Sequence, residues 1–235
     1  MAGHSHSANI KHRKAAVDAK RGKIWTKCSK AIIVAAKLGG GDADTNPRLR
    51  LAVADAKAAR MPKDTIERAI KKGTGELGAD TLEEIIYEGY GPGGVAVMCD
   101  ILTDNRNRTA PEMRKLFEIH GGNLGSTNCV AYMFERKGLF YVPADKIGED
   151  ELMELALEAG AEDVTRDGDA FEILCGPEAY SDVSAKLEEA GIEPDSQQLT
   201  RISQHEVESE DAELAAKVLK FLEAVDDHDD VQSVS

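Results

Sequence analysis

Residues 138–203 read GLFYVPADKIGEDELMELALEAGAEDVTRDGDAFEILCGPEAYSDVSAKLEEAGIEPDSQQLTRIS, and this stretch decides the fold class. Its apolar periodicity and turn residues predict six elements in the order βαββαβ, the ferredoxin-like signature. Gly168 lies in the predicted central hairpin, and Gly191 ends the second predicted helix. The elements are strand 139–143, helix 149–159, strand 162–166, strand 170–175, helix 177–190 and strand 197–203.

The region before this stretch also predicts a sheet. Strands over 82–90 and 95–103 are joined by Gly91-Pro92-Gly93-Gly94, which is typical of a hairpin connection. Thr109 to Glu112 matches the T-x-x-E capping box, which predicts a helix from Thr109 to His120. A strand over 130–135 follows. A final helix over 211–224 and a short segment at 231–234 come after the ferredoxin-like stretch, and we expect this helix to return to the 82–135 sheet.

The first 75 residues predict a helical module. One helix is expected over 20–38 and ends at Gly39-Gly40-Gly41, and Asn46-Pro47 caps a second that reaches Arg60. A third is expected over 62–72. The sequence therefore predicts an α+β protein of three domains, an N-terminal three-helix module followed by two α/β domains. Their expected bounds are 1–75 for the basic helical domain, 80–136 plus 205–235 for a discontinuous α/β domain, and 137–204 for the ferredoxin-like domain.

Charge divides the 235 residues unevenly. The formal net charge is −14, but residues 1–74 contain 17 Lys and Arg against 6 Asp and Glu. The rest contains 12 basic and 37 acidic side chains. Clustered positive charge is the usual sign of nucleic-acid binding, so a polyanion is the expected partner. The alternative is that the two oppositely charged parts attract each other within the fold.

The cations of the helical module are the candidate nucleic-acid contacts. Trp25 is the module's one aromatic residue and lies on the apolar face of its helix, so phosphate contacts along a lysine stripe fit better than base stacking. A solvated helix face is the alternative for that stripe. The candidates are Lys11, Arg13, Lys14, Lys20, Arg21, Lys23, Lys27, Lys30, Lys63, Arg68, Lys71 and Lys72.

A second candidate is an anion site at Arg106 and Arg108, next to the predicted helix N-terminus, where free N–H groups add to the guanidinium charges. Its alternative is pairing of these arginines with the domain's own carboxylates. The acidic cluster Asp226–Asp230 is expected to be a solvated turn.

Other function classes find little support. The four cysteines have no CxxC spacing and indicate reduced thiols in a cytosolic protein, and His4, His6 and His12 fit no zinc pattern. No catalytic constellation can be assembled, so we expect a protein that is not an enzyme, with no cofactor and no metal.

The longest apolar run, Ala31–Ala36, is too short to cross a bilayer, and no signal peptide pattern precedes it, so no membrane partner is expected. The oligomeric state is left open.

Several motifs together resemble the YebC/PmpR family over nearly the whole chain. They are MAGHS at 1–5, ANIKHRK at 8–14, YEGYGPGG at 87–94, TDNRNRT at 103–109 and MFERKG at 133–138. The resemblance implies a helical domain followed by two α/β domains, in a cytoplasmic protein. His6-Ser7 stands where the family commonly carries Lys-Trp, so this chain lacks a cation and an aromatic residue in its N-terminal tail.

The family includes bacterial proteins labelled as DNA-binding transcriptional regulators, a mitochondrial translational activator of cytochrome oxidase, and bacterial members linked to stalled ribosomes. We therefore expect a nucleic-acid-binding regulator of gene expression, first as a transcriptional regulator on duplex DNA. The alternative is a translation factor that binds ribosomal RNA and the ribosome. A second alternative is a protein-interaction scaffold, which leaves the basic module without a role.

Overall fold

The computed structural model describes the backbone of residues 6–78, 81–204 and 211–235, with side chains from residue 21 onward. The chain forms two compact units. The first joins residues up to 127 with residues 209–234, and the second spans residues 128–208. Each unit has a four-stranded sheet of its own, and the α+β class predicted from the sequence is confirmed. No helix in the described part of the chain is long and apolar enough to span a membrane.

Three helices open the first unit: α1 (His6–Gly39), α2 (Pro47–Ala58) and α3 (Lys63–Gly73). Asn46 caps α2 as predicted, because its side chain accepts a hydrogen bond from the Leu49 N–H at 3.1 Å. The Asn46 amide also donates to the Ala35 carbonyl at 2.8 Å, which ties the cap to α1. Ile32, Leu49 and Ile66, one from each helix, share a buried core.

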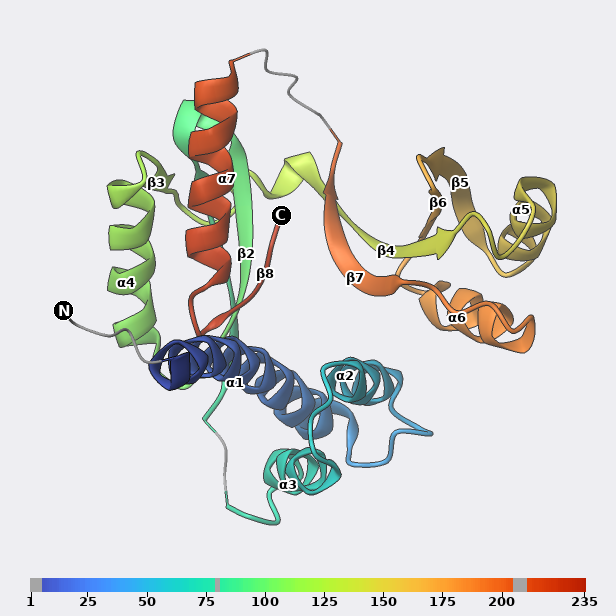
Figure 1. The fold of residues 1–235 in the computed structure, drawn as a ribbon, viewed down its shortest axis with the longest axis horizontal. Helices are drawn as coiled ribbons and strands as arrows, with labels where there is room; N and C mark the ends of the chain where they lie inside the picture. Colours follow the sequence, from blue (N-terminus) through green and yellow to red (C-terminus); the bar gives the residue numbers. More distant parts are fainter. Residues whose placement is uncertain (1–5, 79–80, 205–210) are drawn as a thin grey trace. The chain divides into compact units, whose positions relative to one another are not determined.

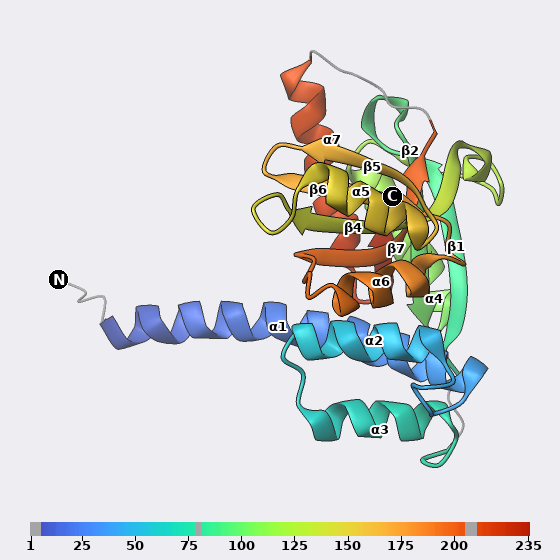
Figure 2. The ribbon, with the colours of Figure 1, turned by 90° about the vertical axis from the view of Figure 1, so that its right-hand side faces the viewer.

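Helix α1 is longer than the sequence predicts. The expected start at residue 20 is wrong, because the helix begins at His6 and runs for 34 residues. In Figure 2, α2 and α3 lie along the C-terminal part of α1, and the first turns of α1 extend beyond them.

The first unit's sheet has the order β3-β1-β2-β8 with antiparallel pairing. Helices α4 and α7 lie side by side on one of its faces (Figure 1). Phe117 of α4 and Phe221 of α7 form an edge-to-face pair with ring centroids 4.9 Å apart. The expected return of the final helix to this sheet is therefore confirmed. The elements are β1 (Glu83–Tyr90), a 3-10 turn (Pro92–Gly94), β2 (Ala96–Thr103), α4 (Arg106–Ile119), β3 (Asn123–Leu124), α7 (Ala212–Asp226) and β8 (Val231–Val234).

The predicted capping box at Thr109 is wrong. Helix α4 begins at Arg106, and its cap is Asn105, whose side chain accepts from the Arg108 N–H at 3.1 Å. Asn is as good a cap as Thr, and here it comes four residues earlier. Thr109 lies inside the helix, fully buried.

The second unit has the ferredoxin-like order β5-β6-β4-β7, with every neighbouring pair antiparallel. Phe140 on β4 stacks on Tyr180 of α6 with centroids 4.8 Å apart, which seals the sheet against its helices. The elements are a 3-10 turn (Ala131–Met133), β4 (Phe134–Pro143), α5 (Glu149–Glu158), β5 (Ala161–Asp167), β6 (Ala170–Cys175), α6 (Tyr180–Glu189) and β7 (Ser196–Ser203).

The two strands predicted at 130–135 and 139–143 are one strand, β4, which begins at Phe134. Gly138 lies between the two predicted strands, but it pairs with Cys175 and Leu199 in the middle of the sheet. A Cβ at Gly138 would lie 2.6 Å from the Cys175 sulfur and 2.6 Å from the Tyr180 ring, so the glycine permits close packing. Residues 134–136 thus pair within the second sheet, while the three-domain division of the chain stays a prediction.

Candidate nucleic-acid interface

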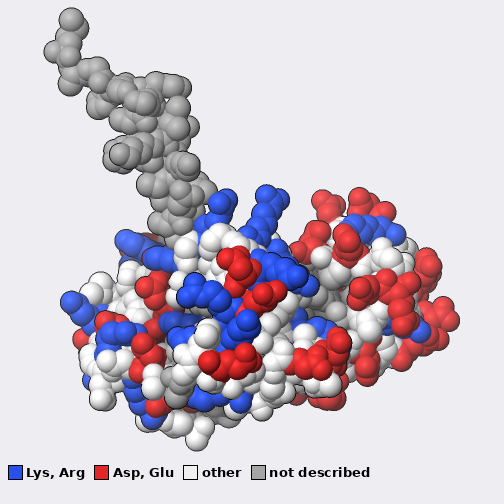
Figure 3. Space-filling view, turned by 90° about the horizontal axis from the view of Figure 1, so that it is seen from below, with Lys and Arg blue, Asp and Glu red and all other residues white. Residues whose placement is uncertain are grey.

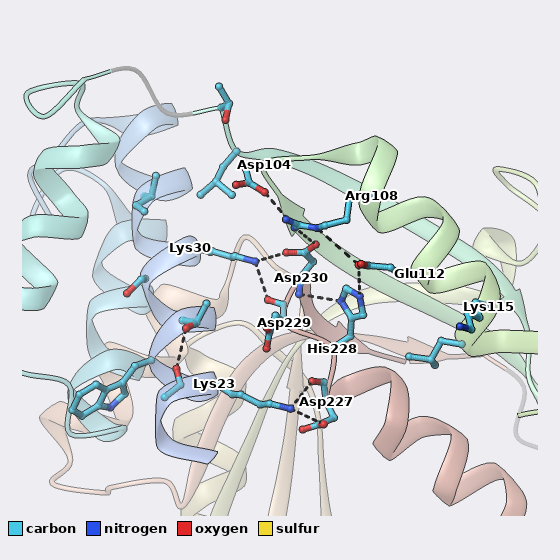
Figure 4. Close-up of a pocket in the computed structure, with 18 of the residues that line it drawn as sticks. Lys23, Lys30, Asp104, Arg108, Glu112, Lys115, Asp227, His228, Asp229 and Asp230 are labelled. Atoms are coloured by element: carbon cyan, nitrogen blue, oxygen red, sulfur yellow. Dashed lines mark hydrogen bonds and ion pairs between the residues drawn. The ribbon is translucent and has the colours of Figure 1, made fainter. Parts of the chain in front are cut away.

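Three lysines of the predicted stripe face the turn between α7 and β8. We call residues Asp226–Asp230 the acidic turn. Lys23 Nζ lies 2.6 Å from Asp227 Oδ2, and Lys27 Nζ lies 2.8 Å from Asp226 Oδ1. Lys30 Nζ lies 2.5 Å from Asp230 Oδ1. Figure 4 shows Lys23 and Lys30 reaching from α1 to this turn.

Each of these ammonium groups also donates to a main-chain carbonyl of the acidic turn. Lys23 donates to the Asp227 carbonyl at 3.2 Å, Lys27 to the Asp226 carbonyl at 2.6 Å, and Lys30 to the Asp229 carbonyl at 2.9 Å. An ammonium group has three donors, so the turn occupies two on each lysine. The expected solvated turn is therefore wrong, because complementary charge draws the turn onto α1.

Asp230 is the fixed point of the acidic turn. Its side chain is only 3% exposed, and it accepts from Thr109 Oγ1 at 2.7 Å and from Arg108 Nη2 at 2.8 Å. Burial disfavours its charged form, but the hydrogen bonds from Lys30, Thr109 and Arg108 outweigh burial. They hold the pKa of Asp230 well below its ordinary range.

The predicted anion site at Arg106 and Arg108 holds a carboxylate of this chain. Besides Asp230, Arg108 approaches Asp104 at 3.3 Å and Glu112 at 3.9 Å, so three carboxylates surround its guanidinium group. Arg106 is exposed. Arg108 therefore pairs with carboxylates of its own domain, which is the alternative that the sequence analysis raised.

His228 completes the turn. Its Nδ1 accepts from the Asp230 N–H at 3.1 Å, which leaves the ring proton on Nε2, 3.2 Å from a Glu112 carboxylate oxygen. An open cleft of about 1290 Å³ lies between α1, α4 and the acidic turn, and side chains of both signs line it. Lys115 of α4 is one of the cations that line it (Figure 4).

Helix α3 presents its cations differently. Lys63 is 89% exposed and makes only a 3.8 Å approach to Glu67 one turn away, and Arg68, Lys71 and Lys72 are exposed as well. The opposite face of α3 packs Ile66 into the core. Over this side of the first unit, Lys and Arg are frequent, whereas the second unit shows mostly Asp and Glu (Figure 3).

Trp25 is half-buried, which leaves only part of its ring for base stacking. Its indole Nε1–H donates to the Ala59 carbonyl at 2.9 Å, and its ring packs against the core of the three helices. The prediction that it lies on the apolar face is confirmed. Arg21 is exposed, but the side chains of Lys11, Arg13, Lys14 and Lys20 lie outside the described residues, as do those of His4, His6 and His12.

Two family models cover almost all of the chain. The model described as the TACO1/YebC protein N-terminal domain matches residues 5–76, and that described as the TACO1/YebC second and third domain matches residues 82–235. The chain belongs to the TACO1/YebC family. The resemblance seen in the sequence motifs is thereby confirmed.

The relatives of this TACO1/YebC protein are similar to it over at least nine-tenths of their own length. A Rhodopirellula baltica protein named a probable transcriptional regulatory protein is 58% identical over 100% of this chain and 95% of its own length. A Persephonella marina protein of the same name is 54% identical over 100% of this chain and 94% of its own. The crystal structure of a conserved hypothetical protein from Aquifex aeolicus superposes with a TM-score of 0.84, at 51% identity, covering 93% of this chain and 90% of that one.

The sequence analysis of this TACO1/YebC protein raised attraction between its two oppositely charged parts as an alternative, and the pairs formed by Lys23, Lys27 and Lys30, here called the α1 lysines, agree with it. It did not identify which carboxylates these lysines meet. The residues that meet are about 200 positions apart in the chain, 204 for Lys23 and Asp227. The available signal was the opposite charge of the two clusters. Among the described side chains, no group of three His, Cys, Asp or Glu residues is placed to hold a metal ion.

Proposed function

We propose that this TACO1/YebC protein is a non-enzymatic regulator of gene expression that binds nucleic acid through backbone phosphates. The exposed cations of α3 carry the proposal. Lys63, Arg68, Lys71 and Lys72 project from a short helix whose other face is fixed in a core. These four cations outnumber the two exposed carboxylates of the helix, Asp64 and Glu67, so the surface of α3 can neutralise phosphates and release their counterions.

The chemistry of this surface favours phosphates over bases as its contacts. Three of the four α3 cations are lysines, which bind phosphate as point charges, whereas base reading uses Arg, Asn and Gln side chains aimed into a groove. Trp25 is half-buried, packs against the helical core and donates to the Ala59 carbonyl, which disfavours base stacking from that position. Binding by shape and charge follows from this set.

Two targets fit a phosphate-binding surface. The first is duplex DNA in transcriptional control, which the names of the bacterial relatives support. The second is structured ribosomal RNA, for a translation factor acting on the ribosome. The α3 cations are mostly lysines, which contact phosphates and do not distinguish bases. This favours ribosomal RNA as the target, because a regulator of particular promoters has to read the base sequence.

Salt dependence tests the proposed binding surface. Replacing the four α3 cations by Gln removes up to four phosphate contacts, so the log–log slope of affinity for duplex DNA against salt becomes shallower by about 3.6. A control variant removes four exposed cations elsewhere and leaves the slope unchanged. The control positions are Arg114, Lys146, Lys217 and Lys220. A wild-type protein that binds neither duplex DNA nor RNA at low salt supports a protein-interaction scaffold instead.

One lysate separates the two targets. Cells that express the protein are lysed, and half of the lysate is sedimented through a sucrose gradient after nuclease trimming of polysomes. The other half is used to map crosslinks on the chromosome. Cosedimentation with ribosomes without discrete chromosomal peaks supports the translation factor. Sharp promoter peaks with the protein only at the top of the gradient support the transcriptional regulator.

A further inference from the structure

The acidic turn binds α1 in the way that a nucleic-acid backbone binds a lysine row. Lys23, Lys27 and Lys30 lie four and three residues apart, so they project from one face of the helix. Each meets a carboxylate oxygen and a carbonyl oxygen of the turn. A row of oxygens that carries negative charge resembles a phosphate strand in its chemistry.

We propose that the acidic turn is a built-in competitor that covers the α1 lysines and leaves them when nucleic acid binds. This inference rests on the proposed function and concerns the regulation of the same basic module. The turn already uses two of the three donors on each lysine, so a phosphate reaches the ammonium groups only by displacing it. Nucleic acid that first binds at α3 then competes with Asp226 and Asp227 for the α1 lysines.

The two ends of the acidic turn are bound with different strength: Asp230 is fixed, whereas Asp226 and Asp227 can leave their lysines. Asp230 is 3% exposed and accepts hydrogen bonds from Thr109 and Arg108 of α4 in addition to its pair with Lys30 of α1. Asp226 and Asp227 are 61% and 69% exposed, and each pairs with a single lysine. Exposed ion pairs contribute little to stability and weaken with salt, so these outer two open first.

The test uses the full-length Asp226→Asn/Asp227→Asn variant. Its binding to a 30-base-pair duplex DNA of random sequence, and to an RNA duplex of the same length, is measured by fluorescence anisotropy from 50 to 300 mM KCl. Losing the two carboxylates leaves Lys23 and Lys27 held only by main-chain carbonyls of the turn, which phosphates displace more easily. Up to two phosphate contacts are added, so the salt slope steepens by up to about 1.8 and affinity at 100 mM KCl rises about tenfold. Asp227→Asn alone gives a smaller change of the same sign, should the double variant fold poorly.

A matched control separates the turn from general charge. The Glu118→Gln/Glu213→Gln variant also removes two exposed negative charges from the first unit. It breaks the 2.7 Å pair between Glu213 and Lys217 and leaves the pairs of the α1 lysines intact. We expect it to leave the salt slope unchanged. Adding Lys23→Gln/Lys27→Gln to the turn variant removes the gain.

Three outcomes overturn the competitor. The first is an equal gain of affinity in the Glu118/Glu213 control. The second is a gain that persists when Lys23 and Lys27 are also replaced. The third is no gain of affinity in the Asp226/Asp227 variant although the wild-type protein binds both probes. The proposed function fails separately, when wild type and all variants leave both probes unbound at 50 mM KCl. In that case the turn has no ligand to compete with, and both proposals are wrong.

Discussion

Helices α1 and α3 carry similar cations in the same module, yet their surroundings differ. The α1 lysines are 41%, 20% and 16% exposed and meet carboxylates from the far end of the chain, whereas Lys63 on α3 is 89% exposed. Charge counted along the sequence treats the two helices alike. Their comparison teaches that a cationic cluster identifies a nucleic-acid surface only after its internal partners are known.

The largest effect is expected at the buried end of the acidic turn. Asp230→Ala leaves Lys30 and Arg108 without their shared carboxylate, and removing one member of a buried ion pair costs about 3 kcal/mol in the free energy of unfolding. Urea unfolding measures this loss. A cost below about 1 kcal/mol contradicts the account of Asp230 as the point that fixes the turn.

Acid should lower the free energy of unfolding through protonation of Asp230, the buried end of the acidic turn. The pKa of Asp230 in the folded protein lies below its ordinary range, so its contribution to stability is complete above the unfolded value, near 4, and is lost as pH falls below it. Wild type should therefore lose more unfolding free energy between pH 5 and pH 2.5 than Asp230→Asn does. Thermal unfolding over this pH range measures the difference, and parallel curves for the two proteins contradict it.

The smallest effect is expected at the exposed end. Asp226 is 61% exposed, so Asp226→Asn should cost less than about 1 kcal/mol in unfolding free energy despite breaking the pair with Lys27. Lys63→Gln on α3 should cost a similarly small amount. A loss at Asp226 as large as that at Asp230 means that the whole turn is one rigid structural unit, which argues against its release.

The sequence predicts the second unit well because its signals are local. Each strand and helix of the ferredoxin-like order has its own periodicity and turn residues, and helix α5 differs from its prediction by one residue. The errors arise where a residue serves tertiary packing. Gly138 falls between two predicted strands but permits close packing against Tyr180 within one strand, and Thr109 is predicted as a cap but binds Asp230.

The candidate site was predictable only in part. Composition indicates which module is basic, and the periodicity of α1 indicates that its lysines share a face. Whether those lysines are open to solvent depends on contacts across about 200 residues, such as the pair formed by Lys27 and Asp226. A single sequence shows the opposite charges of the two clusters but not their distance in space.

The most direct test compares the salt slopes of two variants on the same duplex DNA. One replaces the four exposed α3 cations by Gln, and the other replaces Lys23 and Lys27 by Gln in an otherwise wild-type chain. The account predicts a slope shallower by about 3.6 for the α3 variant and by less than about 1 for the α1 variant. In wild type each phosphate contact that Lys23 or Lys27 gains replaces a contact with Asp227 or Asp226, so few counterions are released on balance. The reverse order, with the larger loss in the α1 variant, contradicts it.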